Sequence, residues 1–185
     1  MAHTTATDLE AALPHIRSSP PDQGRLDLIV RRPAENDREV LEVGMLDPDQ
    51  GLVGDTWRLR PSTRTADGSP HPDMQLNVMN TRVAAVVAGP PERWALAGDQ
   101  LFVDLDLSES NLPPGTRLAL GATVIEITDQ PHRGCAKFSA RFGAEALRFV
   151  NSPAGLQLRL RGVNARVVLG GPVSVGATVR RLPPA

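Results

Sequence analysis

Residues 98–138 of the chain read GDQLFVDLDLSESNLPPGTRLALGATVIEITDQPHRGCAKF. Apolar residues alternate with polar residues over 101–107 and again over 118–127, and a period of two residues predicts half-buried β-strands. Between the two runs, Pro114 and Gly115 suit the central positions of a type II turn. We therefore expect consecutive strands joined by tight turns in this part of the chain.

The strand pattern ends just before the only cysteine of the chain, Cys135. Phe138 and Phe142 then lie four residues apart, which is the spacing of neighbours on one face of a helix. Gly143 is a weak helix former. The sequence therefore predicts a helix that starts after Cys135 and is divided at Gly143.

The rest of the chain shows more strand patterns than helix patterns. Leu26, Leu28 and Val30 alternate with polar residues, as do residues 41–45, and we expect each run to keep one face buried. Two closing strands are expected over 163–169 and 173–182. Because strands and helices do not alternate regularly, we predict a mainly β fold, a closed or partly open barrel with a few short helices, and not a doubly wound sheet.

The domain organisation is predicted to be simple, because 185 residues are enough for one domain with a real core. Thr7 and Glu10 form a capping box that predicts a short helix, and the following SSPPDQG segment is a linker. We assign residues 1–24 to this helix and linker and residues 25–183 to the barrel.

Composition excludes several classes of protein. The net charge is −1, so we expect no nucleic acid partner and no attraction to an anionic membrane. One cysteine excludes an internal disulfide framework and Cys-rich metal sites. The polar N-terminus has no apolar signal core, and we expect a reduced, cytoplasmic protein. Lys137 is the only lysine that could hold pyridoxal phosphate, and we expect none.

The residues around Cys135 carry the clearest chemical signal. A cysteine at a helix N-terminus faces unpaired N–H groups, and Arg133, Lys137 and a protonated His132 add positive charge, all of which favour the thiolate. Gly134 leaves room for a ligand beside the sulfur. We predict a reactive thiolate that carries sulfur or binds a metal, against the alternative of an inert buried cysteine.

His132 has two interpretations of equal weight. It could act as the general base of the thiol, as in Cys–His nucleophilic pairs, which would also allow a Cys-dependent hydrolase. It could equally be a turn residue that orients the loop.

Further basic residues are candidates for binding an anion. Asp55, Arg58 and Arg60 belong to the segment GLVGDTWRLR, where Asp55 can cap or accept hydrogen bonds. Arg58 and Arg60 share a side if the chain is extended and would suit a phosphate or carboxylate, and the favoured alternative is a glycine turn with surface arginines. Arg161 and Arg166 either line an anion site or face water. Asp104 and Asp106 share a strand face, which indicates a solvated surface or a hard-cation site.

An ordered set of these segments resembles one known family. The run 98–138, the later LRGVNARVVLGGPVSVGATVRR at 160–181 and the earlier GLVGD at 51–55 together resemble the MOSC domain, the carboxy-terminal domain of molybdenum cofactor sulfurases. The resemblance covers residues 26–181 and is most specific from residue 98 onward. It implies a compact barrel related to the pyruvate kinase barrel.

The resemblance also implies a function. Cys135 occupies the position of the family's single functional cysteine, which carries sulfur as a persulfide or ligates molybdenum of a pterin cofactor. We therefore expect a catalytic role for Cys135 and His132, with cofactor-binding residues among Asp55, Arg58, Arg133, Lys137, Arg161 and Arg166. The reductase variant of this activity implies N-hydroxylated substrates.

This chain departs from the family in two respects. Trp57 stands near the place where many bacterial members carry a histidine. The desulfurase domain of the large sulfurases is absent, so sulfur or electrons would come from a sulfur donor or a redox partner protein. The alternative is a non-catalytic barrel module that binds a small anion or a partner protein, for which Cys135 would be dispensable.

Overall fold

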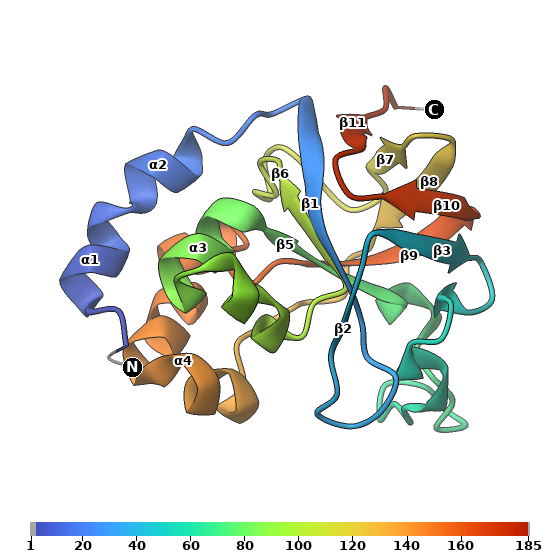
Figure 1. Cartoon of the computed structure of the whole chain (residues 1–185), viewed down its shortest axis with the longest axis horizontal. Helices are drawn as coiled ribbons and strands as arrows, with labels where there is room; N and C mark the ends of the chain where they lie inside the picture. Colours follow the sequence, from blue (N-terminus) through green and yellow to red (C-terminus); the bar gives the residue numbers. More distant parts are fainter. Residues whose placement is uncertain (1–2, 185) are drawn as a thin grey trace.

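A computed structural model describes residues 3–184. Its central feature is a closed, mixed β-barrel, as predicted from the alternating sequence (Figure 1). In spatial order, the barrel strands within the described residues are β1 (Gln23–Arg31), β6 (Leu101–Asp104), β5 (Leu76–Asn80), β9 (Val163–Leu169), β8 (Thr123–Ile127), β7 (Arg117–Leu120) and β11 (Thr178–Arg181). The β11–β1 pairing closes the barrel, and β5–β6 is its parallel pair.

Additional strands extend the barrel at one side. β2 (Glu39–Leu41) pairs with the end of β1, and a second sheet contains β10 (Gly171–Ser174), β3 (Val43–Asp47) and β4 (Gly51–Leu52). The turns between these strands are short. After residue 162 the described chain forms three strands, β9, β10 and β11, where the sequence predicted two.

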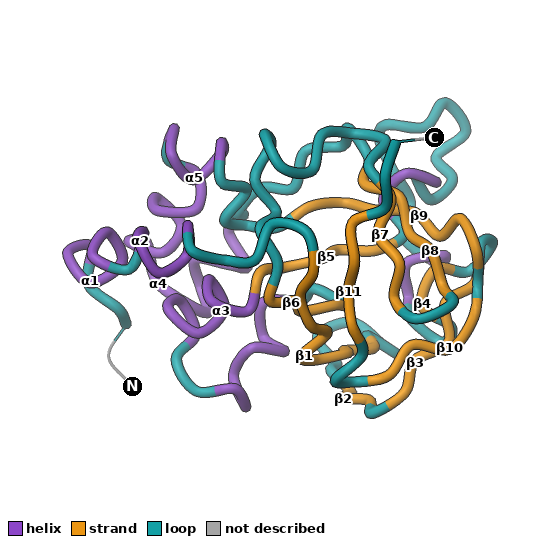
Figure 2. The backbone as a smooth tube through the Cα atoms, turned by 90° about the horizontal axis from the view of Figure 1, so that it is seen from above, coloured by secondary structure: helices purple, strands orange, loops and turns teal. Residues whose placement is uncertain are grey.

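The helices cover the opposite side of the barrel, so that Figures 1 and 2 show a helical layer beside a strand layer. The α-helices are α1 (Ala6–Ala11), α2 (Leu13–Arg17), α3 (Thr81–Ala88), α4 (Ala136–Asn151) and α5 (Pro153–Gln157). Short 3-10 helices are η1 (Thr56–Leu59), η2 (Pro72–Met74) and η3 (Pro91–Ala97). No helix of the described residues has the length and apolar character needed to cross a membrane.

Two hydrophobic cores follow from the alternation of side chains along the strands. Leu101 and Val103 of β6 point into the barrel core, whereas Phe102 between them packs against the helices. On β5, Val78 and Met79 divide between the two cores in the same way. The central strands are therefore buried on both faces, which explains why their sequences are more continuously apolar than those of the outer strands.

In the first predicted strand, Leu26, Leu28 and Val30 do not share one face, so this prediction is wrong. A β-bulge shifts the pairing of β1 with β6 between Leu26 and Leu28, so Leu26 and Ile29 enter the barrel, while Leu28 and Val30 face the helices. The bulge moves every later side chain to the other face.

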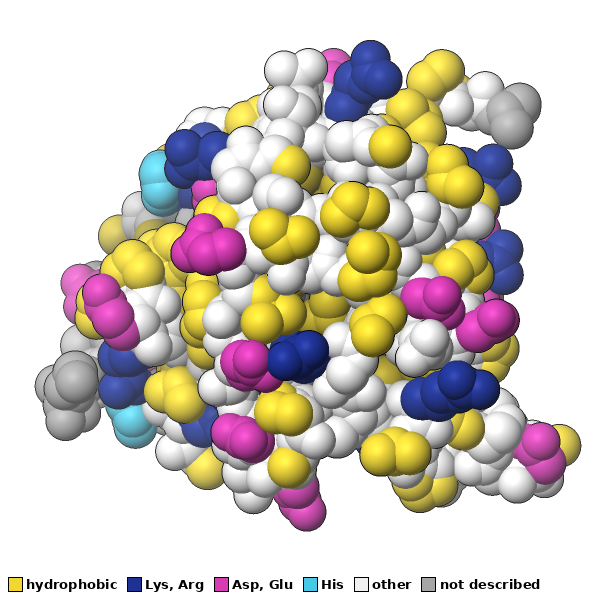
Figure 3. Space-filling model, turned by 45° about the vertical axis from the view of Figure 1, so that its right-hand side comes forward, with side chains coloured by type: hydrophobic (Ala, Val, Ile, Leu, Met, Phe, Trp, Pro, Cys, Tyr) yellow, Lys and Arg dark blue, Asp and Glu magenta, His cyan; other side chains and the backbone are white. Residues whose placement is uncertain are grey.

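On β3, the side expected to be buried faces outward. Val43 is 57% exposed and Met45 is 49% exposed, whereas Leu46 is buried. Gly44 faces inward, as shown by the position of a Cβ built on it, which would lie 2.9 Å from Leu52 Cδ1. Figure 3, which brings this side of the molecule forward, shows apolar side chains across the middle of the face among charges of both signs.

Helix ends were predicted with mixed success. α1 starts earlier than expected: Thr5, not Thr7, is the N-cap, and its side chain accepts a hydrogen bond from the Asp8 N–H. The helix after Cys135 starts at Ala136 as predicted, and Gly143 interrupts it with a non-helical φ of 91°. The division of this helix at Gly143 is confirmed.

Replacing Gly24 by alanine is expected to destabilise the barrel. A Cβ at this position of β1 would lie 1.8 Å from the Asp104 carbonyl oxygen, so β1 and β6 would have to separate. Overpacking of this kind costs about 1–3 kcal/mol. Urea unfolding should show this loss for Gly24→Ala, while Arg180→Ala on the exposed side of β11 should change stability by less than about 0.5 kcal/mol. Equal stability of the two variants would contradict the close approach.

Candidate functional site

Cys135 lies exposed at the start of α4, where it is the N-cap residue. Its backbone is extended (φ −128°, ψ 179°), its carbonyl oxygen accepts the Ser139 N–H at 3.0 Å, and its side chain makes no capping hydrogen bond. The thiol is therefore left available to a ligand or to another molecule. The alternative of a buried cysteine is wrong, and the reactivity of the thiol stays a prediction.

The segment before Cys135 is held by the far end of the same helix. The Asn151 carboxamide accepts the Gly134 N–H at 3.0 Å and donates to the Gly134 carbonyl oxygen at 3.1 Å. A Cβ at residue 134 would lie 2.8 Å from Leu147 Cδ1 and 2.9 Å from Val150 Cγ2. Gly134 thus lets the chain pass close to α4, and Asn151 fixes the backbone that presents the cysteine.

Cys135 lines a cleft of about 570 Å³, which we call the cysteine cleft. Segments from distant parts of the sequence meet there: the loop after β1, η1, the end of η3 and the first turns of α4. Its walls are strongly basic, with Arg32, Arg38, Arg60, Lys137, Arg141 and Arg161.

Three of these six cations are neutralised by carboxylates. Arg32 makes a buried bidentate pair with Asp55, with Nε–Oδ2 at 2.7 Å and Nη2–Oδ1 at 2.8 Å. Lys137 pairs with Glu35 at 3.0 Å on the exposed rim. The third, Arg161, pairs with Asp99, described below.

The other three, Arg38, Arg60 and Arg141, have no carboxylate oxygen within 4.0 Å among residues 3–184. Arg60 donates to Thr56 Oγ1 at 2.8 Å and Arg141 donates to the Leu96 carbonyl oxygen at 2.7 Å. The Nε atom of Arg38 is buried without a hydrogen-bond partner in the described structure. We call these three guanidiniums uncompensated because none has a direct carboxylate partner, although Asp55 acts on Arg38 and Arg60 from a greater distance.

The crowding of like charges shows in the titration of these side chains. Burial lowers the pKa of Arg38, and the neighbouring guanidiniums of Arg141 and Arg32 lower it further. Burial, followed by the charge of Arg32, lowers the pKa of Arg60. A bound anion would oppose the lowering of both pKa values, because its negative charge would stabilise the two guanidinium cations.

Gly98 allows the cationic side chains to approach one another. Its φ of 88° is in the left-handed region, and a Cβ there would lie 3.3 Å from Arg38 Nη2 and 3.7 Å from Arg141 Nη1. A side chain at residue 98 would therefore contact both guanidinium groups.

A buried ionic cluster forms the floor of the cleft. Asp99 is fully buried, and its Oδ2 accepts from Arg161 Nη1 at 2.6 Å while its Oδ1 lies 3.0 Å from His132 Nε2. Arg161 is 7% exposed and lies over the Phe138 ring, with Cζ 5.1 Å from the ring centroid. The cluster joins the chain before β6, the chain before β9 and the loop that leads to Cys135.

The charges in this cluster are well defined. Burial raises the pKa of Asp99, but the charge of Arg161 and the hydrogen bond from His132 outweigh it and bring the pKa to about 2. Burial lowers the pKa of His132, and Arg161 lowers it further. Near neutral pH we therefore expect an ionised Asp99 and a neutral His132 whose Nε2–H donates to it.

His132 does not pair directly with the cysteine. The described residues show no hydrogen bond between the His132 ring and Cys135, and the partner of His132 is Asp99. Its role as a base for the thiol therefore stays an untested prediction, and its observed role is to tie the cysteine loop to the floor of the cleft.

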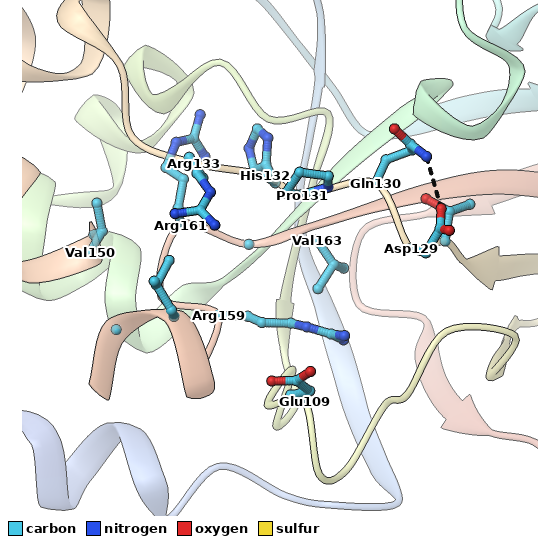
Figure 4. A pocket seen from close by; sticks show the side chains of 14 residues that line it. Glu109, Asp129, Gln130, Pro131, His132, Arg133, Val150, Arg159, Arg161 and Val163 are labelled. Atoms are coloured by element: carbon cyan, nitrogen blue, oxygen red, sulfur yellow. Dashed lines mark hydrogen bonds between the residues drawn. The ribbon is translucent and has the colours of Figure 1, made fainter. Parts of the chain in front are cut away.

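A smaller cleft of about 220 Å³ lies on the other side of His132 and Arg161, which line both clefts. In Figure 4 the segment Gln130–Arg133 runs along one side of it, and Arg159 lies above Glu109 on the opposite side. Two carboxylates, Glu109 and Asp129, lie among its three arginines, whereas the cysteine cleft has one carboxylate, Glu35, among six cations.

The structure brings together only some of the residues predicted from the sequence. Cys135, His132, Lys137 and Arg161 line the cysteine cleft, and Asp55 lies behind it as the partner of Arg32. Arg58, Arg133 and Arg166 do not line it. Arg166 lies elsewhere and pairs with Glu126 and Asp73. Arg58 is exposed, and the exposed Arg133 lines the smaller cleft.

Sequence reasoning missed Arg32, Arg38 and Arg141 as cleft residues. For Arg141 a signal existed, because it follows Lys137 by four residues and so shares its helix face. For Arg32 and Arg38 no local pattern marked them, since only the folding of the chain around β1 brings them beside α4. The described residues also contain no group of three His, Cys, Asp or Glu side chains that could hold a metal ion, so Cys135 would be a single protein ligand.

Comparison with known proteins supports the fold. No family model and no curated protein matches this chain. Among solved structures, the YuaD protein from Bacillus subtilis superposes with a TM-score of 0.65 at 14% identity, covering 85% of this chain and 94% of that one. YiiM from Escherichia coli gives 0.55 at 21% identity, covering 87% and 71%. These likenesses support a MOSC-like barrel fold and show the fold alone.

Replacing Asp99 by asparagine is expected to destabilise the protein strongly. The substitution leaves the buried Arg161 guanidinium without its carboxylate, and breaking a buried pair in this way costs roughly 3–5 kcal/mol. Asp73→Asn removes a more exposed partner of Arg166 and should cost under about 1 kcal/mol. Chemical denaturation of both variants tests this, and a loss for Asp99→Asn no larger than for Asp73→Asn would contradict the proposed cluster.

Stability should fall when the pH is lowered from 7 to 5.5. The folded state holds His132 with a lowered pKa, so the unfolded chain, with a histidine pKa near ~6.5, takes up the proton first and is favoured. His132→Gln should show a smaller loss over the same interval in thermal unfolding. His71→Gln, on the loop before η2, is the control and should keep the wild-type dependence.

Proposed function

We propose that this chain is a MOSC-type protein whose cysteine cleft binds an anionic, phosphate-bearing ligand such as the molybdenum–pterin cofactor, with Cys135 as its sulfur ligand or as a sulfur carrier. One observation carries this proposal. The exposed Cys135 and three uncompensated guanidiniums open on the same cleft.

The basic wall supports a ligand with concentrated negative charge. Arginine matches phosphate oxygens with paired N–H donors, and such charge-assisted hydrogen bonds are among the strongest in proteins. Arg38, Arg60 and Arg141 would hold the phosphate, while Cys135 would face the reactive end of the ligand. When bound, a molybdenum–pterin group would supply a metal centre for two-electron reduction.

Sulfur carriage uses the same residue without a metal. The Cys135 thiolate would attack the outer sulfur of a donor persulfide, so that a new S–S bond forms as the donor S–S bond breaks. The donor leaves as a thiolate with the electron pair of the broken bond, and the persulfide on Cys135 can pass its outer sulfur on. The position at the start of α4 supports this step, because the first N–H groups of the helix favour a negatively charged sulfur.

Cys135→Ser is the direct test of the role of the thiol. Freshly purified wild-type protein should carry either an added sulfur atom that a reductant removes or bound molybdenum with pterin, and the serine variant should carry neither. Intact mass and metal analysis give the two readouts. A serine variant that retains wild-type amounts of molybdenum and pterin would instead identify the non-catalytic anion-binding module.

The double substitution Arg38→Gln/Arg141→Gln tests the anion site. Because each guanidinium contributes charge-assisted hydrogen bonds worth roughly 1.5–3 kcal/mol, the affinity for inorganic phosphate in calorimetry should fall at least about tenfold. Arg17→Gln/Arg180→Gln removes the same charge at exposed positions outside the cleft and is the control. Equal affinities of the two variants would place phosphate elsewhere on the protein.

A further inference from the structure

Three exposed arginines lie on segments that adjoin the cysteine cleft but do not line it: Arg58, Arg64 and Arg133, of which Arg133 lines the smaller cleft on the other side of His132. Arg58 belongs to η1, whose Thr56 and Leu59 do line the cleft. The other two flank the cysteine loop, because Arg64 donates to Gln130 Oε1 at 3.0 Å and Arg133 precedes Gly134. None of the three has a carboxylate within 4.0 Å in residues 3–184.

Leu59, which follows Arg58 in η1, is 80% exposed, the highest value among the exposed large apolar side chains of the described residues. A protruding apolar residue beside unpaired arginines is typical of protein interfaces, where arginine is enriched and apolar contacts form the core. The arginine rim, as we call Arg58, Leu59, Arg64 and Arg133, is therefore built like a contact surface.

The positive charge of the rim is a local property. The whole chain has a net charge of −1, and two acidic residues lie near the rim: Asp129 accepts from Gln130, the partner of Arg64, and Glu35 lines the cleft. Within the described residues neither forms an ion pair with a rim arginine, because Glu35 pairs with Lys137. An unneutralised cationic surface on a nearly neutral protein attracts acidic partners and orients them toward itself. Such a partner would arrive directly beside the cysteine.

Sulfur delivery requires a second molecule. The chain has one cysteine, so the sulfur that loads Cys135 cannot come from another cysteine of this chain. The donor must reach the exposed thiol through the mouth that the arginine rim borders. Resting on the proposed function, we propose that the arginine rim is a docking surface for the acidic face of a protein that transfers a persulfide sulfur to Cys135.

A protein partner fits this surface better than a nucleic acid. Bases stack on exposed aromatic rings, but the chain has no tyrosine, and its four phenylalanines and Trp57 are buried. The other tryptophan, Trp94, is half-buried, stacks on Phe102 and does not line the cysteine cleft. The apolar member of the rim, Leu59, has no stacking face. The chemistry of the rim thus combines charge for an acidic surface with an aliphatic contact.

The test uses persulfide donors that differ in charge. A short glutamate-rich peptide with one cysteine persulfide is compared with a glutamine-rich peptide of the same length, and loading of Cys135 is followed by intact mass. The glutamate-rich donor should react roughly threefold or more faster at low ionic strength, and the difference should shrink as salt is added.

Matched variants test whether the rim arginines produce the preference for the acidic donor. Arg58→Gln/Arg133→Gln should lose most of the preference for the acidic donor, whereas Arg17→Gln/Arg180→Gln, which lowers the net charge by the same two units, should keep it. Cooperative thermal unfolding confirms that the variants are folded, and the single change Arg58→Gln serves if the first double variant is not. An equal preference in both double variants would overturn the proposal.

Two further outcomes separate this proposal from its alternatives. The small neutral persulfide of N-acetylcysteine methyl ester should load Cys135 equally in all variants; failure to load even the wild type would contradict the proposed sulfur-carrier function instead. A short single-stranded oligonucleotide that binds the rim more tightly than the glutamate-rich peptide would assign the surface to nucleic acid and overturn the protein-docking proposal.

Discussion

The fully buried carboxylate of Asp99 is the contact on which the cysteine cleft depends. It binds Arg161 and His132 at once, and so joins the chain before β6, the chain before β9 and the loop that leads to Cys135. Barrel and helical layer meet at this point. A charge this deep is tolerated because its partners compensate for the loss of water, and the result is a fixed floor beneath the thiol.

The arginines around this floor divide according to whether a carboxylate neutralises them. Arg32 and Arg161 have buried acidic partners and serve the structure. Arg38, Arg60 and Arg141 have none, although burial and mutual repulsion disfavour their charge. These groups lie together beside an exposed cysteine, and this arrangement is the basis of our proposal that the cleft binds an anion, whose charge would offset theirs.

The sequence predicted the parts of the molecule that local patterns control. Alternation gave the barrel, and Cys135 and Gly143 were placed correctly at the start and the break of α4. It failed on the faces of β1 and β3, because a bulge and the inward packing of Gly44 are set by neighbouring strands. Arg32 and Arg38 were missed for the same reason: their partners lie more than twenty residues away, or are absent.

The central claim is that the uncompensated arginines of the cysteine cleft bind an oxyanion next to Cys135. Anomalous diffraction from crystals soaked in tungstate tests it most directly, because the anomalous signal of tungsten shows where the oxyanion binds without prior assumptions about the site. We predict the strongest peak in the cleft, in contact with the guanidiniums of Arg38, Arg60 and Arg141. Peaks confined to exposed arginines outside the cleft, such as Arg17 and Arg180, would contradict the account.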